Sequence, residues 1–275
     1  MNRGEIRALV PAAGLSSRMG DFKPLLDLGG KPLIVRTVES LFRGGLRSVT
    51  VVLGFRGDEI ENILRGEFAG QGEGRELRFV WNRNFAGSDM LASIKLGLEA
   101  WGGAETEGPW FLLPADMPAV RGETLRGLAN FALANFALAD LTLTNCASAN
   151  SSSAEFTGTG GARGDSPGGL LVTFPTDGGS GLRRGHPPLI EAPCIPLILN
   201  WREGGGLRGF WKTLGRGIAL FPAGDEGCFM DADTPADYLR LKEYWSTLDT
   251  PGGARFDIGG ECPGSAAVDA IKKRG

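Results

Sequence analysis

The stretch LVPAAGLSSRMGDFK, residues 9–23, decides the fold of this chain. It continues a short apolar run, Ile6 to Val10, that favours a buried strand. The run breaks into the small residues Pro11-Ala-Ala-Gly14, which let backbone N–H groups point into an anion-binding concavity. Arg18 and Lys23 add positive charge to the same loop. We therefore predict a phosphate-holding loop at the carboxyl end of a strand, where open α/β sheets bind their ligands.

This loop differs from the two commonest phosphate-binding motifs. A Walker A loop is G-x-x-x-x-G-K-[ST], whereas here the spacing from Gly14 to Gly20 is too long and Lys23 follows Gly20 by three residues. The Rossmann fingerprint G-x-G-x-x-G is absent as well. Because the chain has 44 glycines in 275 residues, a purely structural turn is the alternative. The pairing of Arg18 and Lys23 with small residues favours phosphate binding.

Strand-like and helix-like patterns alternate through the first half of the chain. Apolar runs predict strands at 48–53, 77–81 and 110–113, and apolar residues recur with helical spacing at 34–42 and 90–101. Such alternation predicts a mostly parallel sheet with helices on both faces. We therefore expect an α/β fold, a three-layer α/β/α doubly wound arrangement in a single domain.

The second half of the chain is less regular. A third helix is expected over 123–138, and strands are expected at 141–144 and 170–174. The last helix is expected from about Pro235 to residue 245, with Thr234 as its N-cap and the proline in its first turn.

Two segments are too polar and too rich in small residues to pack. Residues 146–169 are rich in Ser, Gly and Ala, and such a segment cannot bury enough apolar surface to offset its ordering entropy. We predict a flexible insertion there and a loose tail over 248–275, which leaves one domain over 1–247.

The composition excludes several classes of protein. The net charge of −3 argues against general nucleic-acid binding. Four cysteines lie far apart and there is one histidine, so a Cys/His zinc site and a disulfide scaffold are not expected. No apolar run reaches the about 20 residues of a membrane span, and the N-terminal apolar run is too short for a secretory signal. We expect a cytoplasmic protein with no membrane or nucleic-acid partner.

Asp116 stands in the sequence LPADMP, at the end of a predicted strand. Its carboxylate is therefore expected at the carboxyl edge of the sheet, near the phosphate loop. Mg²⁺ takes one or two protein carboxylates, several waters and substrate phosphates, so Asp116 suits a Mg²⁺ ligand. The alternative is a simple Asx turn before Pro118.

A second acidic motif, MDADTP, carries Asp231 and Asp233. In an extended backbone two side chains at i and i+2 point the same way. One of them could complete a Mg²⁺ site with Asp116, and the other could cap the following helix or orient a ligand. Asp231 is slightly favoured as the metal ligand, and plain helix capping remains the alternative.

The segment NFAGSDMLASIKLGL, from Asn84 to Leu98, combines a polar turn with a helix. Ser93 and Gly97 are four residues apart and share one helix face. Such a small face lets a nucleobase approach and hydrogen-bond to Ser93. Close packing of the helix on the sheet through Gly97 is an equally good explanation.

The single histidine, His186, lies in LRRGHPPL. A histidine in a proline-bounded turn favours a substrate contact or a structural role over proton transfer. The neighbouring Arg183 and Arg184 could bind an acceptor phosphate, or they form a solvated basic face.

Together these motifs resemble the MobA-like nucleotidyltransferases, and most of all the branch of molybdenum-cofactor cytidylyl- and guanylyltransferases. The resemblance covers about residues 6–245. It implies a nucleotide-diphospho-sugar transferase-like fold in which the loop binds the NTP and the acids bind Mg²⁺. Arg18, Lys23 and Asp116 would be catalytic, Arg184 and His186 would bind the acceptor, and Asp116, Asp231 and Asp233 would hold the metal. The implied nucleotide-binding residues are Ala12, Ala13, Gly14, Ser16, Arg18, Gly20, Lys23, Asn84 and Ser93.

The resemblance implies transfer of NMP, from CTP or GTP, to a phosphate-bearing acceptor such as molybdopterin, with release of pyrophosphate. A molybdoenzyme or its chaperone is a further implied partner. Two alternatives stay open: a sugar-1-phosphate nucleotidyltransferase, and a non-catalytic nucleotide-binding or cofactor-chaperone protein. The chain departs from the family pattern at Pro11, where a small aliphatic residue is usual, in the segment 146–169, and in the tail.

Overall fold

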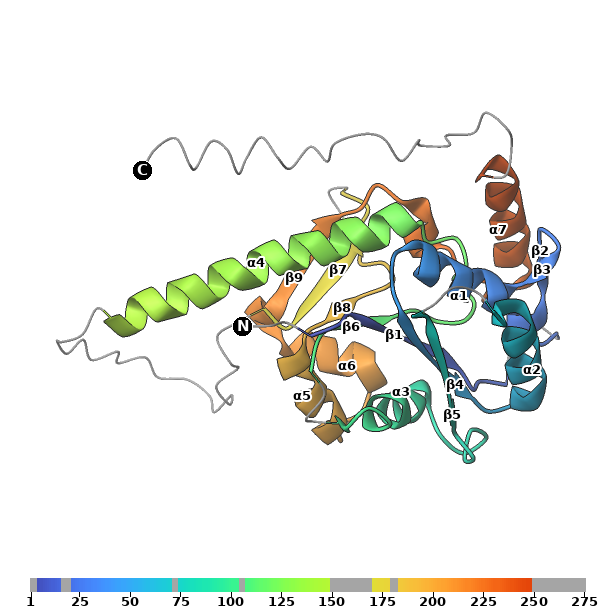
Figure 1. The fold of residues 1–275 in the computed structure, drawn as a ribbon, viewed down its shortest axis with the longest axis horizontal. Helices are drawn as coiled ribbons and strands as arrows, with labels where there is room; N and C mark the ends of the chain where they lie inside the picture. The colour runs from blue at the N-terminus through green and yellow to red at the C-terminus, as the bar shows by residue number, and fades with distance from the viewer. Residues whose placement is uncertain are drawn as a thin grey trace.

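The computed structural model describes residues 4–15, 21–70, 74–103, 107–148, 170–178 and 183–248, with the backbone alone described over 136–148. A seven-stranded sheet forms its centre, in the order β5-β4-β1-β6-β8-β7-β9 (Figure 1). The strands are β1 (Arg7–Ala12), β4 (Ser48–Leu53), β5 (Glu76–Trp81), β6 (Trp110–Leu112), β7 (Val172–Thr176), β8 (Leu189–Ile190) and β9 (Ile218–Pro222).

All the strands of this sheet except β8 run in the same direction. β4, β1, β5 and β6 pair in parallel, and β7 pairs in parallel with β9. β8 is antiparallel to both β6 and β7, so β7 again runs parallel to β6. The carboxyl ends of the parallel strands therefore lie along one edge, and the end of β8 lies at the opposite edge.

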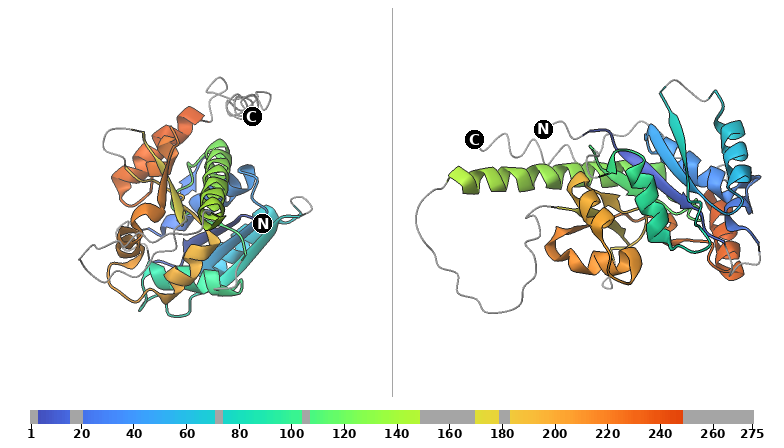
Figure 2. Two further views of the ribbon diagram at one scale, coloured as in Figure 1. Left: turned by 90° about the vertical axis from the view of Figure 1, so that its left-hand side faces the viewer. Right: turned by 90° about the horizontal axis from the view of Figure 1, so that it is seen from below.

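Helices cover both faces of the sheet, as expected (Figure 2). α1 (Leu33–Arg43), α2 (Gly57–Phe68) and the start of α4 (Gly122–Ser148) pack on one face. α3 (Met90–Glu99), α5 (Ile195–Asn200) and α6 (Gly206–Thr213) pack on the other. β1 contributes to the hydrophobic core on each face of the sheet. Ala8 and Val10 pack in the core on the first face, and Leu9 packs in the core on the second. This alternation follows from the period of two in a strand.

A smaller third core lies beside the sheet. The hairpin of β2 (Asp27–Leu28) and β3 (Lys31–Pro32) packs with α7 (Pro235–Leu248) around Leu28, Leu33 and Trp245. The single-turn helices are η1 (Lys23–Leu25), η3 (Ala192–Cys194), η4 (Gly215–Gly217) and η5 (Glu226–Phe229). None of the helices in the described ranges has the length and apolar character needed to cross a membrane.

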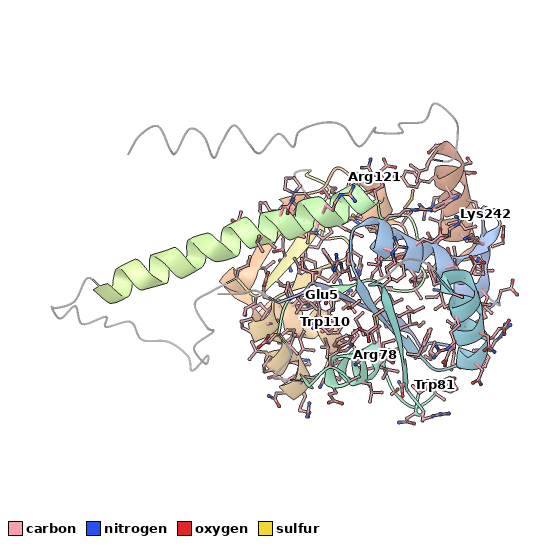
Figure 3. All side chains as sticks on the ribbon, in the orientation of Figure 1. Glu5, Arg78, Trp81, Trp110, Arg121 and Lys242 are labelled. Carbon is pink, nitrogen blue, oxygen red and sulfur yellow. The ribbon has the colours of Figure 1, made fainter. Side chains whose placement is uncertain are left out.

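The predicted strands of the first half are confirmed to within one or two residues at each end. Trp110, labelled in Figure 3, begins β6. It is fully buried and packs edge-on against Trp101, with 5.9 Å between ring centroids. The predicted strand at 170–174 is present as β7. The predicted last helix is present as α7.

The strand predicted at 141–144 is wrong. Residues 141–144 belong to α4, which continues from Gly122 to Ser148 and extends beyond the sheet (Figure 1). The residues just before them, 128–140, are rich in Ala and Leu and contain no Gly or Pro. The helix therefore propagates through the short Leu-Thr-Leu-Thr stretch. The insertion predicted at 146–169 lies outside the described residues, apart from the end of α4, as does the tail beyond Leu248.

Candidate functional site

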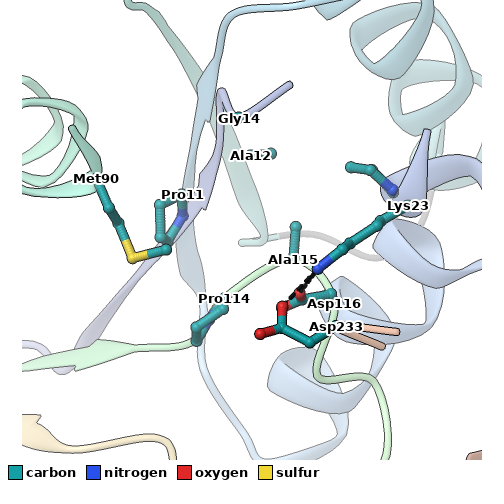
Figure 4. Close-up of a pocket in the computed structure, with 10 residues that line it drawn as sticks. Pro11, Ala12, Gly14, Lys23, Met90, Pro114, Ala115, Asp116 and Asp233 are labelled. Atoms are coloured by element: carbon teal, nitrogen blue, oxygen red, sulfur yellow. Dashed lines mark hydrogen bonds and ion pairs between the residues drawn. The ribbon is translucent and has the colours of Figure 1, made fainter. Parts of the chain in front are cut away.

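A pocket of about 250 Å³ opens at the carboxyl edge of the sheet, between the ends of β1 and β6 (Figure 4). This is the position at which open α/β sheets bind ligands. The residues that line it are Pro11, Ala12, Gly14, Lys23, Pro24, Met90, Pro114, Ala115, Asp116 and Asp233. Five positions from the sequence prediction, in three separate motifs, are therefore brought to one place by the fold: Ala12, Gly14, Lys23, Asp116 and Asp233.

The Lys23 side chain lies between two carboxylates of this pocket. Its Nζ is 2.5 Å from Oδ1 of Asp233 and 3.4 Å from Oδ2 of Asp116 (Figure 4). The lysine side chain is only 12% exposed, against 20% for Asp116 and 42% for Asp233. The contacts span 93 and 210 residues of sequence, so only the tertiary fold creates this arrangement.

The backbone at Lys23 is fixed by local packing. Pro24 is buried and supplies the first turn of η1, and the N–H of Leu26 donates to the carbonyl of Lys23. Phe22 is buried with its ring edge-on to Phe55, 5.4 Å between centroids. Lys23 therefore leaves a rigid turn and reaches into the pocket.

The pKa of Asp116 is raised above its ordinary value. Burial is the largest cause, and the negative charges of Asp231 and Asp233 act in the same direction, whereas Lys23 opposes them. An anion that is buried beside other anions attracts a cation. At present the ammonium of Lys23 supplies that charge.

The second acidic motif divides between two pockets. Asp233 lines the first pocket, whereas Asp231 lines a neighbouring one. The backbone bends after Asp231, whose Oδ1 accepts a hydrogen bond from the N–H of Asp233 at 3.3 Å. The expectation that both carboxylates point the same way is therefore not met. Neither Asp231 nor Asp233 caps the following helix, because Thr234 is the N-cap of α7.

The neighbouring pocket, about 380 Å³, is lined by Asp177, Arg183, Glu226, Phe229, Met230, Asp231, Asp237 and Arg240. Asp177 follows β7, so this pocket lies at the same edge of the sheet as the first. The guanidinium of Arg183 lies 5.1 Å from the centre of the Phe229 ring and donates to the Phe229 carbonyl. Arg183 thus lines a pocket here, whereas the predicted acceptor residue Arg184 lies over the ring of Phe174.

His186, the other predicted acceptor residue, is held beside these pockets. Its backbone N–H donates to the carbonyl of Cys228 at 2.8 Å, and its Nδ1 is buried with no hydrogen-bond partner. Burial lowers the pKa of His186, while a hydrogen bond with the backbone of Leu112 and the charge of Asp231 oppose that change. The lowered pKa disfavours the imidazolium form, so His186 is poorly suited to act as a phosphate-binding cation.

Asn82, which is not among the residues predicted from the sequence, organises the polar turn before α3. It is buried, and its Nδ2 donates to the hydroxyls of Ser88 and Ser93, both at 2.9 Å. Its Oδ1 accepts the backbone N–H of Asn84 at 3.0 Å. The available signal was its position directly after β5, at the carboxyl edge. Ser93 is buried against Asn82 and is not among the described residues that line the first pocket.

Two glycines permit close approach around the site. A Cβ on Gly97 would lie 2.3 Å from Cδ1 of Leu9, which confirms the packing explanation for that residue. A Cβ on Gly54 would lie 2.6 Å from the carbonyl oxygen of Ala13, which is a buried residue. Gly54, directly after β4, was also missed.

Three predicted nucleotide-binding residues, Ser16, Arg18 and Gly20, lie outside the described residues. Within the parts of the chain that are described, no three His, Cys, Asp or Glu side chains are grouped so as to hold a metal ion by themselves. Any metal in this pocket therefore needs ligands from water or substrate in addition to one or two carboxylates.

Curated relatives match short parts of the chain. A CMP-5'-(3-aminopropyl)phosphonate synthase from Streptomyces rubellomurinus is 31% identical over 99 residues, which is 34% of this chain and 15% of the relative. A 2-C-methyl-D-erythritol 4-phosphate cytidylyltransferase from Rhodococcus opacus is 43% identical over 53 residues, 18% of this chain and 24% of the relative. These matches span a quarter or less of the relatives' own lengths.

Solved structures share the fold over most of the chain. A nucleotidyl transferase from Methanothermobacter thermautotroptrophicus superposes with a TM-score of 0.63 at 24% identity, over 90% of this chain and all of that one. A Mycobacterium tuberculosis protein in complex with manganese gives 0.52 at 18% identity, over 88% and 100% of the two chains. Molybdopterin-guanine dinucleotide biosynthesis protein A from Archaeoglobus fulgidus gives 0.51 at 17% identity, over 87% and 98%.

The family model of the MobA-like NTP transferase domain matches residues 8–217, which contain the loop, Asp116 and His186. That range includes β1 to β8 and all the helices from α1 to α6. The chain belongs to the MobA-like NTP transferase family.

Proposed function

We propose that this chain is a nucleotidyltransferase that transfers NMP from an NTP to a phosphate-bearing acceptor and releases pyrophosphate. The observation that carries the proposal is Lys23, held between Asp116 and Asp233 in a pocket at the carboxyl edge of the sheet. Family membership supports the same class of reaction.

The reaction needs little acid–base chemistry. An acceptor phosphate oxygen forms a bond to the α-phosphorus, and the bond from that phosphorus to the bridging oxygen of pyrophosphate breaks. The acceptor phosphate is already ionised at pH 7, so no proton has to be removed. Catalysis then consists of positioning and charge neutralisation. Lys23 exchanges its carboxylate partners for phosphate oxygens, and the loop residues Ala12 and Gly14 line the space for the phosphates.

Asp116 and Asp233 fit a divalent cation, with Mg²⁺ as our proposal. Both carboxylates already lie within reach of one cation, the Lys23 ammonium, and Mg²⁺ needs only one or two protein carboxylates beside water and phosphate. When bound, the metal would neutralise charge on the phosphates. Asp231, which lines the neighbouring pocket, is the third candidate.

For the substrates we propose CTP or GTP and, as acceptor, molybdopterin. The names of two curated relatives support a cytidylyl donor and a phosphate or phosphonate acceptor. The second pocket, with Arg183, supports an acceptor site beside the first. A sugar-1-phosphate acceptor, and a non-catalytic nucleotide-binding or chaperone role that serves a molybdoenzyme, are the alternatives. We place the reaction in the cytoplasm.

The test is release of pyrophosphate from each of the four NTPs, with molybdopterin, a sugar 1-phosphate and 3-aminopropylphosphonate as acceptors. We expect release that depends on acceptor and divalent metal, with CTP or GTP preferred. Binding of NTP with no release for any acceptor would favour the chaperone alternative.

Asp116→Asn provides the matched variant, because it removes the charge and keeps the shape. We expect it to abolish metal-dependent release. Glu191→Gln is the control, since it also removes the charge of a carboxylate and keeps its shape, but Glu191 is a buried residue that follows β8 at the opposite edge of the sheet. Unchanged turnover in Asp116→Asn would rule out the metal assignment.

A further inference from the structure

Asp225 is a buried carboxylate that lines neither pocket, yet it joins the segments that carry the acids of the site. Its side chain is fully buried. Oδ2 accepts the backbone N–H of Arg121 at 3.0 Å and the hydroxyl of Thr124 at 2.6 Å. Oδ1 accepts the N–H of Gly227 at 3.0 Å.

These contacts make Asp225 a cap supplied from another part of the chain. Arg121 immediately precedes α4 (Figure 3). Thr124 lies in the first turn of this helix. The first N–H groups of a helix have no partner within the helix, and a negative charge there is favoured by the helix dipole. Asp225, about a hundred residues away, satisfies that need. The Nε of Arg121 lies 3.2 Å from Oδ1 and adds an opposite charge.

The turn that follows Asp225 packs on the segment that follows Asp116. A Cβ on Gly227 would lie only 2.0 Å from the carbonyl oxygen of Ala119, so η5 and residue 119 are in direct backbone contact. The same turn also holds His186, whose N–H donates to the carbonyl of Cys228.

The geometry is therefore that of a junction. On one side is Ala119, three residues after Asp116. On the other side is η5, which is followed along the chain by Asp231 and Asp233. Hydrogen bonds to a charged group are stronger than those between neutral groups, so Asp225 fixes the contact between these two segments more firmly than a neutral residue would.

We propose that Asp225 is a positioning residue: it sets the separation between Asp116 and the Asp231/Asp233 segment, and thereby the affinity of the site for a divalent cation. This rests on the proposed function, which supplies the cation and the nucleotide. Asp225 itself touches neither.

The test uses the full chain and Mn²⁺, whose binding is measured by electron paramagnetic resonance in the presence of α,β-methylene CTP or GTP. Asp225→Asn turns one acceptor oxygen into a donor, which must face an N–H or a hydroxyl. We expect the Mn²⁺ dissociation constant to rise about 10- to 100-fold, as is typical for loss of a partner that orients metal ligands. Turnover should fall at low metal concentration and recover in part at high metal concentration.

Two further variants and the control variant separate a change in metal affinity from simple loss of folding. Thr124→Val removes only the 2.6 Å hydrogen bond and should weaken Mn²⁺ binding in the same direction but less. Gly227→Ala leaves Asp225 intact and pushes η5 away from Ala119, so it should reproduce the metal defect. Glu191→Gln, the buried carboxylate at the opposite edge, should lower Tm without changing Mn²⁺ affinity.

The outcomes distinguish failure of the proposed function from failure of the positioning role of Asp225. If the wild-type chain binds no Mn²⁺ with nucleotide and releases no pyrophosphate, the proposed function fails. If the wild type does both, and folded Asp225→Asn and Gly227→Ala keep the wild-type Mn²⁺ affinity, the positioning role is overturned. A fall in Tm without a change in Mn²⁺ affinity would also overturn it.

Discussion

At the scale of the residue, the site is organised around one buried ammonium. Lys23 is one of two lysines in the described chain that bridge a pair of carboxylates; the other is Lys31, between Glu39 and Glu67. Lys23 faces a pocket, whereas Lys31 links α1 to α2 on the surface. The same local chemistry therefore has different consequences in the two places.

Lys23→Met should lower kcat by about 10²–10³-fold, the typical cost of removing one donor aimed at developing charge. It should also weaken NTP binding. Lys31→Met is the matched control, because it also removes an ammonium from between two acids, and its kcat should stay near wild type. An equal loss in both variants, measured by pyrophosphate release, would refute a specific role for Lys23.

The pH dependence of activity should report Asp116. Its pKa is raised, chiefly by burial and further by Asp231 and Asp233. The carboxylate must be ionised to bind a cation, so kcat/KM should decline with falling pH sooner than for an ordinary aspartate. Asp231→Asn removes one cause of the raised pKa of Asp116. It should therefore move the decline of kcat/KM on the acid side to lower pH. An acid-side decline that stays at the same pH, or moves to higher pH, would contradict its assignment to Asp116.

At the scale of the element, helix starts position the acids. α7 begins with a reciprocal pair in which Thr234 Oγ1 accepts the N–H of Asp237 at 3.2 Å, and Asp237 Oδ2 accepts the N–H of Thr234 at 3.0 Å. This capping box directly follows Asp233. The direction of Asp233 is thus tied to the first turn of the helix.

Thr234→Ala should cost about 1 kcal/mol of stability, the typical value for an N-cap.

Asp237 has a lowered pKa because of its hydrogen bond with Thr234 and its pairing with Arg240. Its stabilisation is therefore complete above the unfolded-state pKa and is lost as pH falls through the lower folded-state pKa. Urea unfolding of wild type and Asp237→Asn should differ at pH 7 and converge in acid. A difference that persists in acid would refute this.

Gly97 sets how closely α3 approaches the sheet. Gly97→Ala introduces a Cβ that would lie 2.3 Å from Leu9 and 2.9 Å from Val52, and such overpacking typically costs about 1–3 kcal/mol. Gly66→Ala in α2 is the control, since a Cβ there meets nothing within 4 Å. Denaturant unfolding should show a loss only at position 97.

At the scale of the whole molecule, the site exists only where separate segments meet. The pocket draws on residues from the end of β1 and just after it, from η1, from the start of α3, from the segment after β6 and from the segment before α7. A ligand that binds there stabilises the folded state alone.

CTP or GTP with Mg²⁺ should therefore raise Tm, and saturation at 100 times the dissociation constant corresponds to about 2.7 kcal/mol. In Asp116→Asn the part of this shift that depends on metal should disappear, while Glu191→Gln should keep it. A metal-dependent shift of the same size in Asp116→Asn would show that the cation binds elsewhere.

Much of the architecture was predictable because strand and helix periods are local properties. The apolar runs at 48–53 and 110–113 and the helix from Pro235 needed no tertiary information. The strand prediction at 141–144 failed because four residues of alternating Leu and Thr cannot compete with a helix that already propagates into them. Asn82 and Asp225 were missed because their importance lies in partners that sequence spacing does not reveal.

The sequence by itself determined the α/β class, the position of a loop of small residues after the first strand, for which we propose phosphate binding, and the residues Lys23, Asp116 and Asp233 as chemistry-bearing groups. Periodicity and residue type suffice for that. Only the tertiary structure decided which acids meet Lys23, that Asp233 and Asp231 serve different pockets, and that Asp225 joins their segments. The physical reason is that hydrogen bonds and ion pairs act over a few ångströms, and the groups that they join here are up to 210 residues apart.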